Sequence, residues 1–179
     1  MLSKLLFTLR SAFVCTLSLI ATATLAQTTI HVGPGQSYTT IQSGIDAAVD
    51  GDTVLVAPGT YNENINFKGK AITVVSAQGA AKTIIQGDET AAVVTFNTAE
   101  NRNSVINGFT IQGVSNPSSG QNYSGVLVGS APTILNNIIT NHPCNGIQVD
   151  FGGPLIQGNV ISNTNAANNG SCEIGRAHV

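Results

Sequence analysis

A short repeat in the second half of the chain is the feature that most constrains the fold. Residues 132–141 align with residues 154–163, and Pro, Asn and Ile recur at matched positions. The segments 125–128 and 146–149 recur at nearly the same spacing. At about 3.3 Å per residue, a repeat of roughly 22 residues makes several short strands joined by turns rather than one strand. The period therefore predicts a solenoid in which each repeat forms one coil.

A degenerate copy of the repeat precedes these two. We align Gly108 with Asn137 and Phe109 with Ile138, which makes this unit longer than the one after it. The recurrent Asn and Gly residues suit turns, because both tolerate a left-handed backbone. We also expect the stacked Asn side chains to bond the backbone of neighbouring coils.

One helix precedes the strands. A capping box formed by Thr39 and Gln42 indicates its start, and Gly51 indicates its end. Its apolar face consists of Ile41, Ile45, Ala48 and Val49. We therefore expect a helix at about residues 39–50 that covers the open end of the first coil, as solenoids require.

Short β-branched segments follow, separated by Gly, Asn and Pro. They are typical of strands and comprise Thr53–Val56, Ala71–Val75, Thr83–Ile85, Ala92–Phe96 and Ser104–Ile106. Because equivalent strands of successive coils pair, they form parallel sheets around a column of Val, Ile and Leu, in which Ile139 stacks over Ile161. The sequence thus predicts an all-β solenoid with a short N-terminal cap helix and roughly four to five coils.

Residues 1–26 have the pattern of a secretory signal peptide. Lys4 and Arg10 give a basic start, residues 11–20 are mostly apolar, and small residues precede a polar switch. The apolar run is shorter than the roughly 20 residues that span a bilayer. We expect cleavage after Ala26 and a secreted, periplasmic or cell-surface protein, with no membrane contact once the signal is removed.

The last residues depart from the repeat. Residues 174–179 equal the translation of ATC GGA AGA GCA CAC GTC, which resembles common sequencing-adapter DNA, and Glu173 fits the two bases before it. We therefore expect a truncated solenoid domain at residues 27–172 and a non-native tail at residues 173–179. The uncapped coil near Ile161 would then invite self-association.

Signal cleavage leaves two cysteines, Cys144 and Cys172, in a compartment where disulfides form. They can pair or stay unpaired, because their separation in a repetitive fold places them either one coil apart or far from each other. The sequence does not decide between these alternatives.

Composition argues against several classes of partner and cofactor. The net charge is -2 with no basic run, so nothing would neutralise a phosphate backbone, and nucleic acid is not expected. His142 lies in a predicted turn without a second histidine or acid at ligand spacing. Asp50 and Asp52 lack the further acids of a calcium loop. We expect no metal site and no cofactor, and calcium is unsupported.

The segment Tyr38–Glu63 resembles the opening of secreted right-handed parallel β-helix proteins of the pectin lyase-like superfamily. The Asn-rich coils after it are similar to the repeats of the same group, and the resemblance covers about residues 30–163. It implies a right-handed parallel β-helix. It does not select an activity, because the superfamily is similar to polysaccharide lyases, glycoside hydrolases and pectin methylesterases, and also to repeat proteins without known chemistry.

Within this resemblance, Gly59–Glu63 is similar to the first signature of pectin methylesterases, Gly-x-Tyr-x-Glu. Asp150 and Phe151 share only Asp-Phe with the segment that carries the nucleophile in those enzymes, and the later arginine that binds a uronate carboxylate is missing before the tail. We therefore expect Tyr61 and Glu63 to shape the first turn.

Within the coils, Asp88 and Glu89 are the only neighbouring acids that could form the carboxyl pair of a glycoside hydrolase. The residues around them favour a solvated turn instead.

The loop Val114–Ser124 interrupts the repeat by about seven residues, and solenoids place specificity in such loops. Tyr123 could stack on a sugar ring while the flanking Asn122 and Ser124 bond its hydroxyls, although a passive surface loop is the alternative. Tyr123, Asn122 and Asp150 are the candidate ligand-binding residues, and no catalytic residue is assigned.

Three functions follow from these observations. The preferred one is a secreted β-helix module that binds extracellular polysaccharide and has no complete active site in this segment. The first alternative is a pectate lyase, pectin lyase or pectin esterase, acting on uronate-rich polymers and truncated before its catalytic residues. The second is a structural or adhesion repeat of the cell surface. The sequence does not decide whether the chain is an enzyme.

Overall fold

The fold is described by a computed structural model that covers residues 26–88, 90–113 and 123–164. Within these ranges lie one helix and fifteen short strands. They are β1 (Thr29–Val32), α1 (Ile41–Ala47), β2 (Thr53–Val56), β3 (Gly59–Asn62), β4 (Ile65–Asn66), β5 (Thr73–Ser76), β6 (Thr83–Gln86), β7 (Val94–Phe96), β8 (Val105–Asn107), β9 (Thr110–Gln112), β10 (Val126–Val128), β11 (Thr133–Leu135), β12 (Ile138–His142), β13 (Ile147–Val149), β14 (Leu155–Gln157) and β15 (Val160–Thr164). The predicted signal peptide and tail lie outside the described residues.

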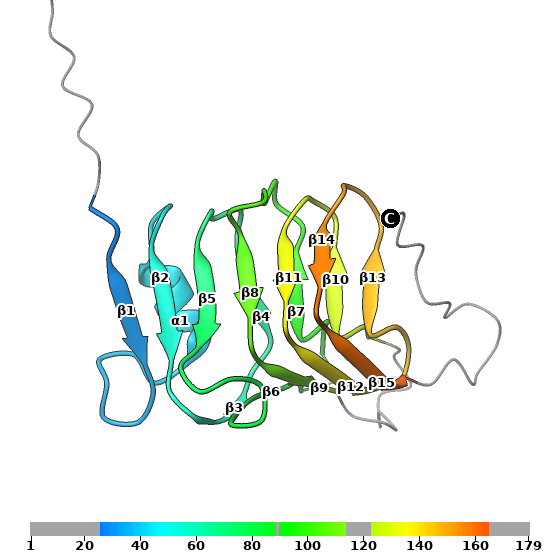
Figure 1. Cartoon of the computed structure of the whole chain (residues 1–179), viewed down its shortest axis with the longest axis horizontal. Coiled ribbons are helices and arrows are strands. Elements are labelled where there is room, and N and C mark those ends of the chain that lie inside the picture. Colours follow the sequence, from blue (N-terminus) through cyan, green and yellow to red (C-terminus); the bar gives the residue numbers. More distant parts are fainter. Residues whose placement is uncertain (1–25, 89, 114–122, 165–179) are drawn as a thin grey trace, which may run out of the picture.

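The strands form three parallel sheets that run along the molecule (Figure 1). Sheet A has the order β1-β2-β5-β8-β11-β14, sheet B the order β15-β12-β9-β6-β3, and sheet C the order β13-β10-β7-β4. Each complete coil therefore contributes one strand to each sheet, and the chain completes about five turns. The chain descends through sheet A and returns through sheet C behind it while advancing along the axis, so the solenoid is right-handed (Figure 1). The predicted fold class is confirmed.

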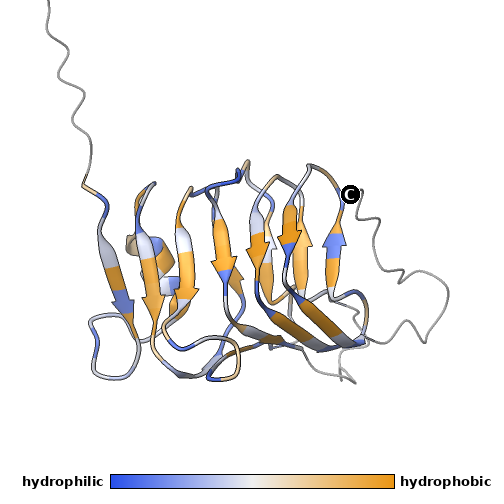
Figure 2. Ribbon diagram, in the orientation of Figure 1, coloured by the Kyte–Doolittle hydropathy of each residue, from blue (hydrophilic) through white to orange (hydrophobic). Residues whose placement is uncertain are grey.

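The core is a stack of matched apolar side chains from successive coils. In sheet A, Val54, Val74, Ile106, Ile134 and Ile156 occupy one register position. In sheet B the corresponding column is Tyr61, Ile85, Ile111, Ile139 and Ile161, so the predicted stacking of Ile139 on Ile161 is confirmed. Figure 2 shows apolar residues concentrated on the strands of all three sheets. Burying these columns drives the coils together.

The turn between sheets A and B corrects the predicted alignment of the degenerate repeat. Ile138 pairs with Thr110, so Gly108 corresponds to Asn136 and not to Asn137. The physical reason is the backbone: Gly108 has φ +80°, Asn136 φ +52° and Gly158 φ +68°, all in the left-handed region. The insertion in this coil is thus one residue shorter than predicted.

The residue after this turn supplies the expected ladder of amide hydrogen bonds. The Asn137 Oδ1 accepts a bond of 2.9 Å from the backbone N–H of Phe109 in the preceding coil. In turn, the backbone N–H of Asn137 donates to the Asn159 Oδ1 at 2.9 Å. Asn137 is buried, so each amide satisfies backbone groups that would otherwise be unpaired.

Helix α1 is shorter than the predicted span of about residues 39–50, because it begins at Ile41 and ends at Ala47. Its N-cap is Thr40, whose hydroxyl accepts from the Ser43 N–H at 3.2 Å, so the predicted capping box is wrong. The Gln42 side chain instead makes two hydrogen bonds with the backbone of Asn66 in β4. These bonds hold the helix on the first coil. The helix ends because the backbone of Ala48 is extended. Val49 after it is exposed, so Val49 does not belong to the apolar face. The expected cover over the first coil is nevertheless present, with Ile41 and Ile45 fully buried.

The last described coil differs from those before it. Leu155, Val160 and Ile161 are exposed, as predicted for the coil near Ile161, whereas Ile139 one coil earlier is buried. Within the described part of the chain, no helix is long and apolar enough to cross a membrane.

Candidate functional site

The outer face of sheet C forms a shallow groove along the stack of coils. Its floor is a ladder of outward residues, one from each coil: Asn66, Thr95, Leu127 and Gln148. Neighbouring strands are about 4.8 Å apart, so the ladder extends for about 14 Å. Short strands place these residues outward because alternate side chains face opposite sides of a sheet. We call this hollow the sheet C groove.

Turns before and after the strands of sheet C supply its two rims. Ala91, Ala92, Tyr123 and Ser124 precede β7 and β10 and form one rim. The other rim consists of Asn97 and Asp150, which follow β7 and β13. The hollow has a volume of about 480 Å³ and is open to solvent. An open trough of this shape suits an extended ligand better than a small molecule that must be enclosed.

A chain of hydrogen bonds crosses the groove between the rims. The Ser124 hydroxyl donates to Gln148 Oε1 at 2.8 Å, and Gln148 Nε2 donates to Asp150 Oδ1 at 2.9 Å. Gln148 is thereby held in one orientation, with one N–H and one lone pair remaining. Within the described residues, the second carboxylate oxygen of Asp150 and the Thr95 hydroxyl make no hydrogen bond, so both are available to a ligand.

Among the described residues that line the groove, Asp150 is the only one with a charged side chain. The nearest lysine along the chain from the floor residue Asn66 is Lys68, whose Nζ contacts Asp46 Oδ1 at 2.7 Å. Lys70 donates to three carbonyl groups at the end of α1. Arg102 lines a different hollow, beside sheet A. The groove is therefore weakly negative.

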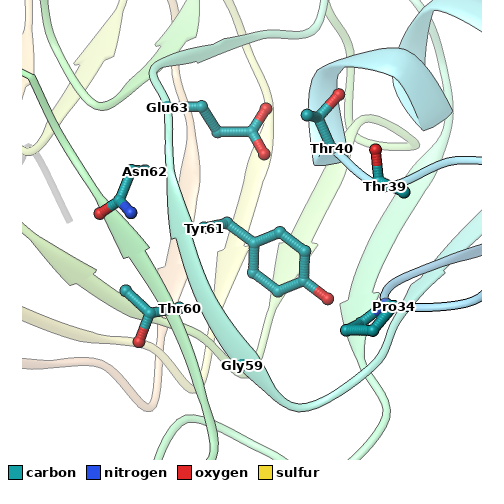
Figure 3. Close-up of a pocket in the computed structure, with 8 residues that line it drawn as sticks. All are labelled: Pro34, Thr39, Thr40, Gly59, Thr60, Tyr61, Asn62 and Glu63. Atoms are coloured by element: carbon teal, nitrogen blue, oxygen red, sulfur yellow. The ribbon is translucent and has the colours of Figure 1, made fainter.

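A second hollow lies at the first coil and contains the Gly-x-Tyr-x-Glu segment (Figure 3). We call it the first-coil hollow. The Glu63 carboxylate accepts from the backbone N–H groups of Ile41 at 2.7 Å and of Gln42 at 2.9 Å, at the start of α1. Tyr61 is buried and donates to the Ala57 carbonyl at 2.9 Å. As predicted, Tyr61 and Glu63 shape the first turn.

Carboxylates elsewhere are bound in the same way. Glu100 is buried and accepts from the backbone N–H of Gly69, the backbone N–H of Thr98 and the hydroxyl of Ser130, at 2.8 to 2.9 Å. Asp52 accepts from Thr28 and Val49, and the Thr28 hydroxyl is the main cause of its lowered pKa. These acids tie one coil to the next and have no free oxygen pair for acid–base chemistry.

Asp88 belongs to the turn predicted from the sequence. It accepts hydrogen bonds from Thr90 and Asn64, and the Thr90 hydroxyl is the main cause of its lowered pKa. A lowered pKa keeps this carboxyl ionised, which is the opposite of what a general acid needs. Its sequence neighbour Glu89 lies outside the described residues.

His142 occupies the interior, not a turn. It ends β12, is buried, and its Nε2 lies 3.2 Å from the carbonyl oxygen of Ile111, so that nitrogen carries the proton. Burial lowers the pKa of His142, with a smaller opposing contribution from the Ile111 bond. The described residues contain no group of three or more His, Cys, Asp or Glu placed to hold a metal ion.

Cys144 is disulfide-bonded. The other cysteine of the predicted mature chain, Cys172, which the sequence leaves either paired or unpaired with it, lies outside the described residues.

The structure brings together two of the three predicted ligand residues. Tyr123 and Asp150 lie on opposite rims of the sheet C groove, although they are far apart in the sequence. Asn122 lies outside the described residues. Sequence reasoning missed Gln148 and the other floor residues. The signal that could have found them is the alternation within segments such as Gly-Ile-Gln-Val, which places the polar residue on the outer face.

Comparisons of this chain with protein-family models, curated proteins and solved structures found no match.

Proposed function

We propose that this protein is a secreted β-helix module that binds extracellular polysaccharide in the sheet C groove. The observation that supports this most is the convergence of Tyr123 and Asp150 on one open trough with a polar floor. The trough follows the axis of the solenoid, so each coil offers one floor side chain to a polymer that lies along it. The resemblance of Tyr38–Glu63 to pectin lyase-like openings and the signal-like pattern of residues 1–26 support the secreted, polysaccharide-related assignment.

Binding without turnover is the form of this proposal that the described residues favour. Glycoside hydrolysis needs two carboxyl groups about 5 to 9.5 Å apart. Asp150 is the only acid among the described residues that line the groove. Elsewhere, Glu63, Glu100 and Asp52 accept hydrogen bonds from backbone N–H groups. Asp150 therefore acts in recognition.

Affinity electrophoresis of the full chain in gels that contain single polysaccharides tests the proposal. We expect at least one polymer to retard the protein and Tyr123→Ala to abolish most of the retardation. Phe151→Ala is the matched control, because Phe151 is an exposed aromatic residue outside the lining of the groove. Equal loss in both variants, or no retardation in any gel, would overturn the proposal.

Turnover is measured on the same preparation. Unsaturated-uronide absorbance and methanol release with pectin and pectate should stay at background. Turnover that Asp150→Asn abolishes would establish the enzyme alternative instead.

A further inference from the structure

We infer that the sheet C groove selects a neutral polysaccharide rather than a uronate polymer. This inference rests on the proposed function and concerns the chemical class of its ligand. It starts from charge: Asp150 is the sole charged side chain among the described lining residues, and it is negative.

A uronate polymer carries a carboxylate on each sugar, and a binding site must neutralise these charges with arginine, lysine or a bridging cation. The groove provides none from its described lining, and Arg102 faces the hollow beside sheet A. A ligand carboxylate close to Asp150 would be repelled by the charge of that side chain. The groove therefore disfavours a uronate polymer at each register that places a carboxylate near Asp150.

Neutral sugars present hydroxyl groups, which donate and accept hydrogen bonds at once. The groove contains groups that also donate and accept: the amide of Gln148, the amide of Asn97 and the hydroxyl of Thr95. The free carboxylate oxygen of Asp150 can accept from a sugar hydroxyl in a charge-assisted hydrogen bond, which is stronger than a neutral one. Such a contact needs a hydroxyl hydrogen, which a uronate carboxylate lacks.

Apolar contacts complete the match. Leu127 occupies the floor between Thr95 and Gln148, and the ring of Tyr123 stands on the rim. These surfaces suit the C–H faces of sugar rings, while the polar ladder suits their edges. Because the ladder spans about 14 Å across four coils, affinity should rise with oligosaccharide length until every coil is in contact.

Affinity electrophoresis and isothermal titration calorimetry test the inference with defined probes: β-1,4-galactan, xyloglucan and dextran as neutral polymers, and sodium polygalacturonate as the uronate polymer. At low salt we expect at least one neutral polymer to bind about tenfold more tightly than polygalacturonate. Asp150→Lys should weaken neutral binding and create salt-sensitive binding to polygalacturonate. Arg102→Gln is the control outside the groove and should change neither. Thermal unfolding verifies that each variant is folded.

The outcomes separate the inference from the proposal on which it rests. Polygalacturonate binding as tight as the best neutral polymer, lost in Tyr123→Ala, would overturn the inference and keep the polysaccharide-binding function. Polygalacturonate binding lost only in Arg102→Gln would place uronate recognition beside sheet A and also overturn it. Absence of binding to any of the four polymers would overturn the proposed function itself.

Discussion

The first-coil hollow and the sheet C groove have similar composition but use their polar groups differently. Both contain a tyrosine, an acid and several small polar residues. In the first-coil hollow, Glu63 accepts hydrogen bonds from the start of α1, and Tyr61 donates one to the Ala57 carbonyl. In the groove, Asp150 and Gln148 bond each other and retain capacity for a ligand. The comparison separates a hollow that stabilises the fold from a face that is free to bind.

The origin of the difference lies in where each acid sits in the coil. An acid in a turn meets the unpaired N–H groups of a neighbouring helix start or coil, and satisfying them stabilises the fold. Asp150 also lies in a turn, directly after β13, but its side chain meets the Gln148 amide on the outer face of sheet C instead of a helix start. The donors beside each acid therefore make the difference.

The largest expected effect concerns Glu63. Glu63→Ala leaves the N–H groups of Ile41 and Gln42 without an acceptor, so we expect a loss of about 2 kcal/mol in the free energy of unfolding, measured by urea denaturation. Polysaccharide affinity, measured on the folded fraction, should be unchanged. A loss of affinity without a loss of stability would place ligand binding in the first-coil hollow.

Tyr123 should behave in the opposite way. Removing its ring takes away an apolar contact for a sugar but little buried packing, because Tyr123 is only partly buried. Tyr123→Ala should lower polysaccharide affinity about tenfold in calorimetry, which corresponds to about 1.4 kcal/mol. Its free energy of unfolding should change by less than about 1 kcal/mol. Strong destabilisation with unchanged affinity would show that the two hollows are not distinct in role.

Acid should weaken the fold near the groove through His142. Burial lowers the pKa of His142 in the folded state, so the unfolded chain binds the proton more readily. The histidine contribution to stability is thus complete above about pH 6.5 and is lost as the pH falls from there through the lowered folded-state pKa. His142 lies against Gly125, next to the Tyr123 rim, so this rim should loosen before α1 does.

Urea denaturation at pH 7.5, 6.0 and 5.0 measures this effect. His142→Gln is the control, because it keeps a donor for the Ile111 carbonyl and cannot titrate. The same decline in the variant would exclude His142 as its source.

The smallest effect is expected at Thr60, an exposed residue of β3 that lines the first-coil hollow. Thr60→Ala should change the free energy of unfolding by no more than about 0.5 kcal/mol and leave affinity unchanged. A clear loss of affinity in calorimetry would contradict the assignment of this hollow to the fold.

The repeat made most of the fold predictable from the sequence. Matched Ile residues in consecutive repeat units fix the register of β12 on β15, as expected for a buried column. In the degenerate copy, side-chain similarity places Gly108 opposite Asn137, whereas the left-handed backbone places it opposite Asn136. The sequence predicts Thr39 as the helix cap, whereas the cap in the structure is Thr40. Gln42, the other half of the predicted capping box, is bound to β4, which is distant in sequence.

The candidate site was less predictable. A loop and a partial motif point to Tyr123 and Asp150, but nothing in the sequence indicates that these residues face each other across one sheet. Their proximity depends on the register of β10 against β13, which pairs Leu127 with Gln148. Composition alone also could not show that Glu63 and Glu100 are occupied by backbone donors, since such bonds depend on which coils become neighbours.

Side-chain amide signals in ¹H–¹⁵N NMR test the central claim most directly, because both hollows contain an amide reporter. The protein is titrated with an oligosaccharide of the polymer that binds best in electrophoresis. We expect the side-chain NH₂ signals of Asn97 and Gln148 in the sheet C groove to shift, while that of Asn62 in the first-coil hollow stays in place. A shift of Asn62 with Asn97 and Gln148 unmoved would contradict the account.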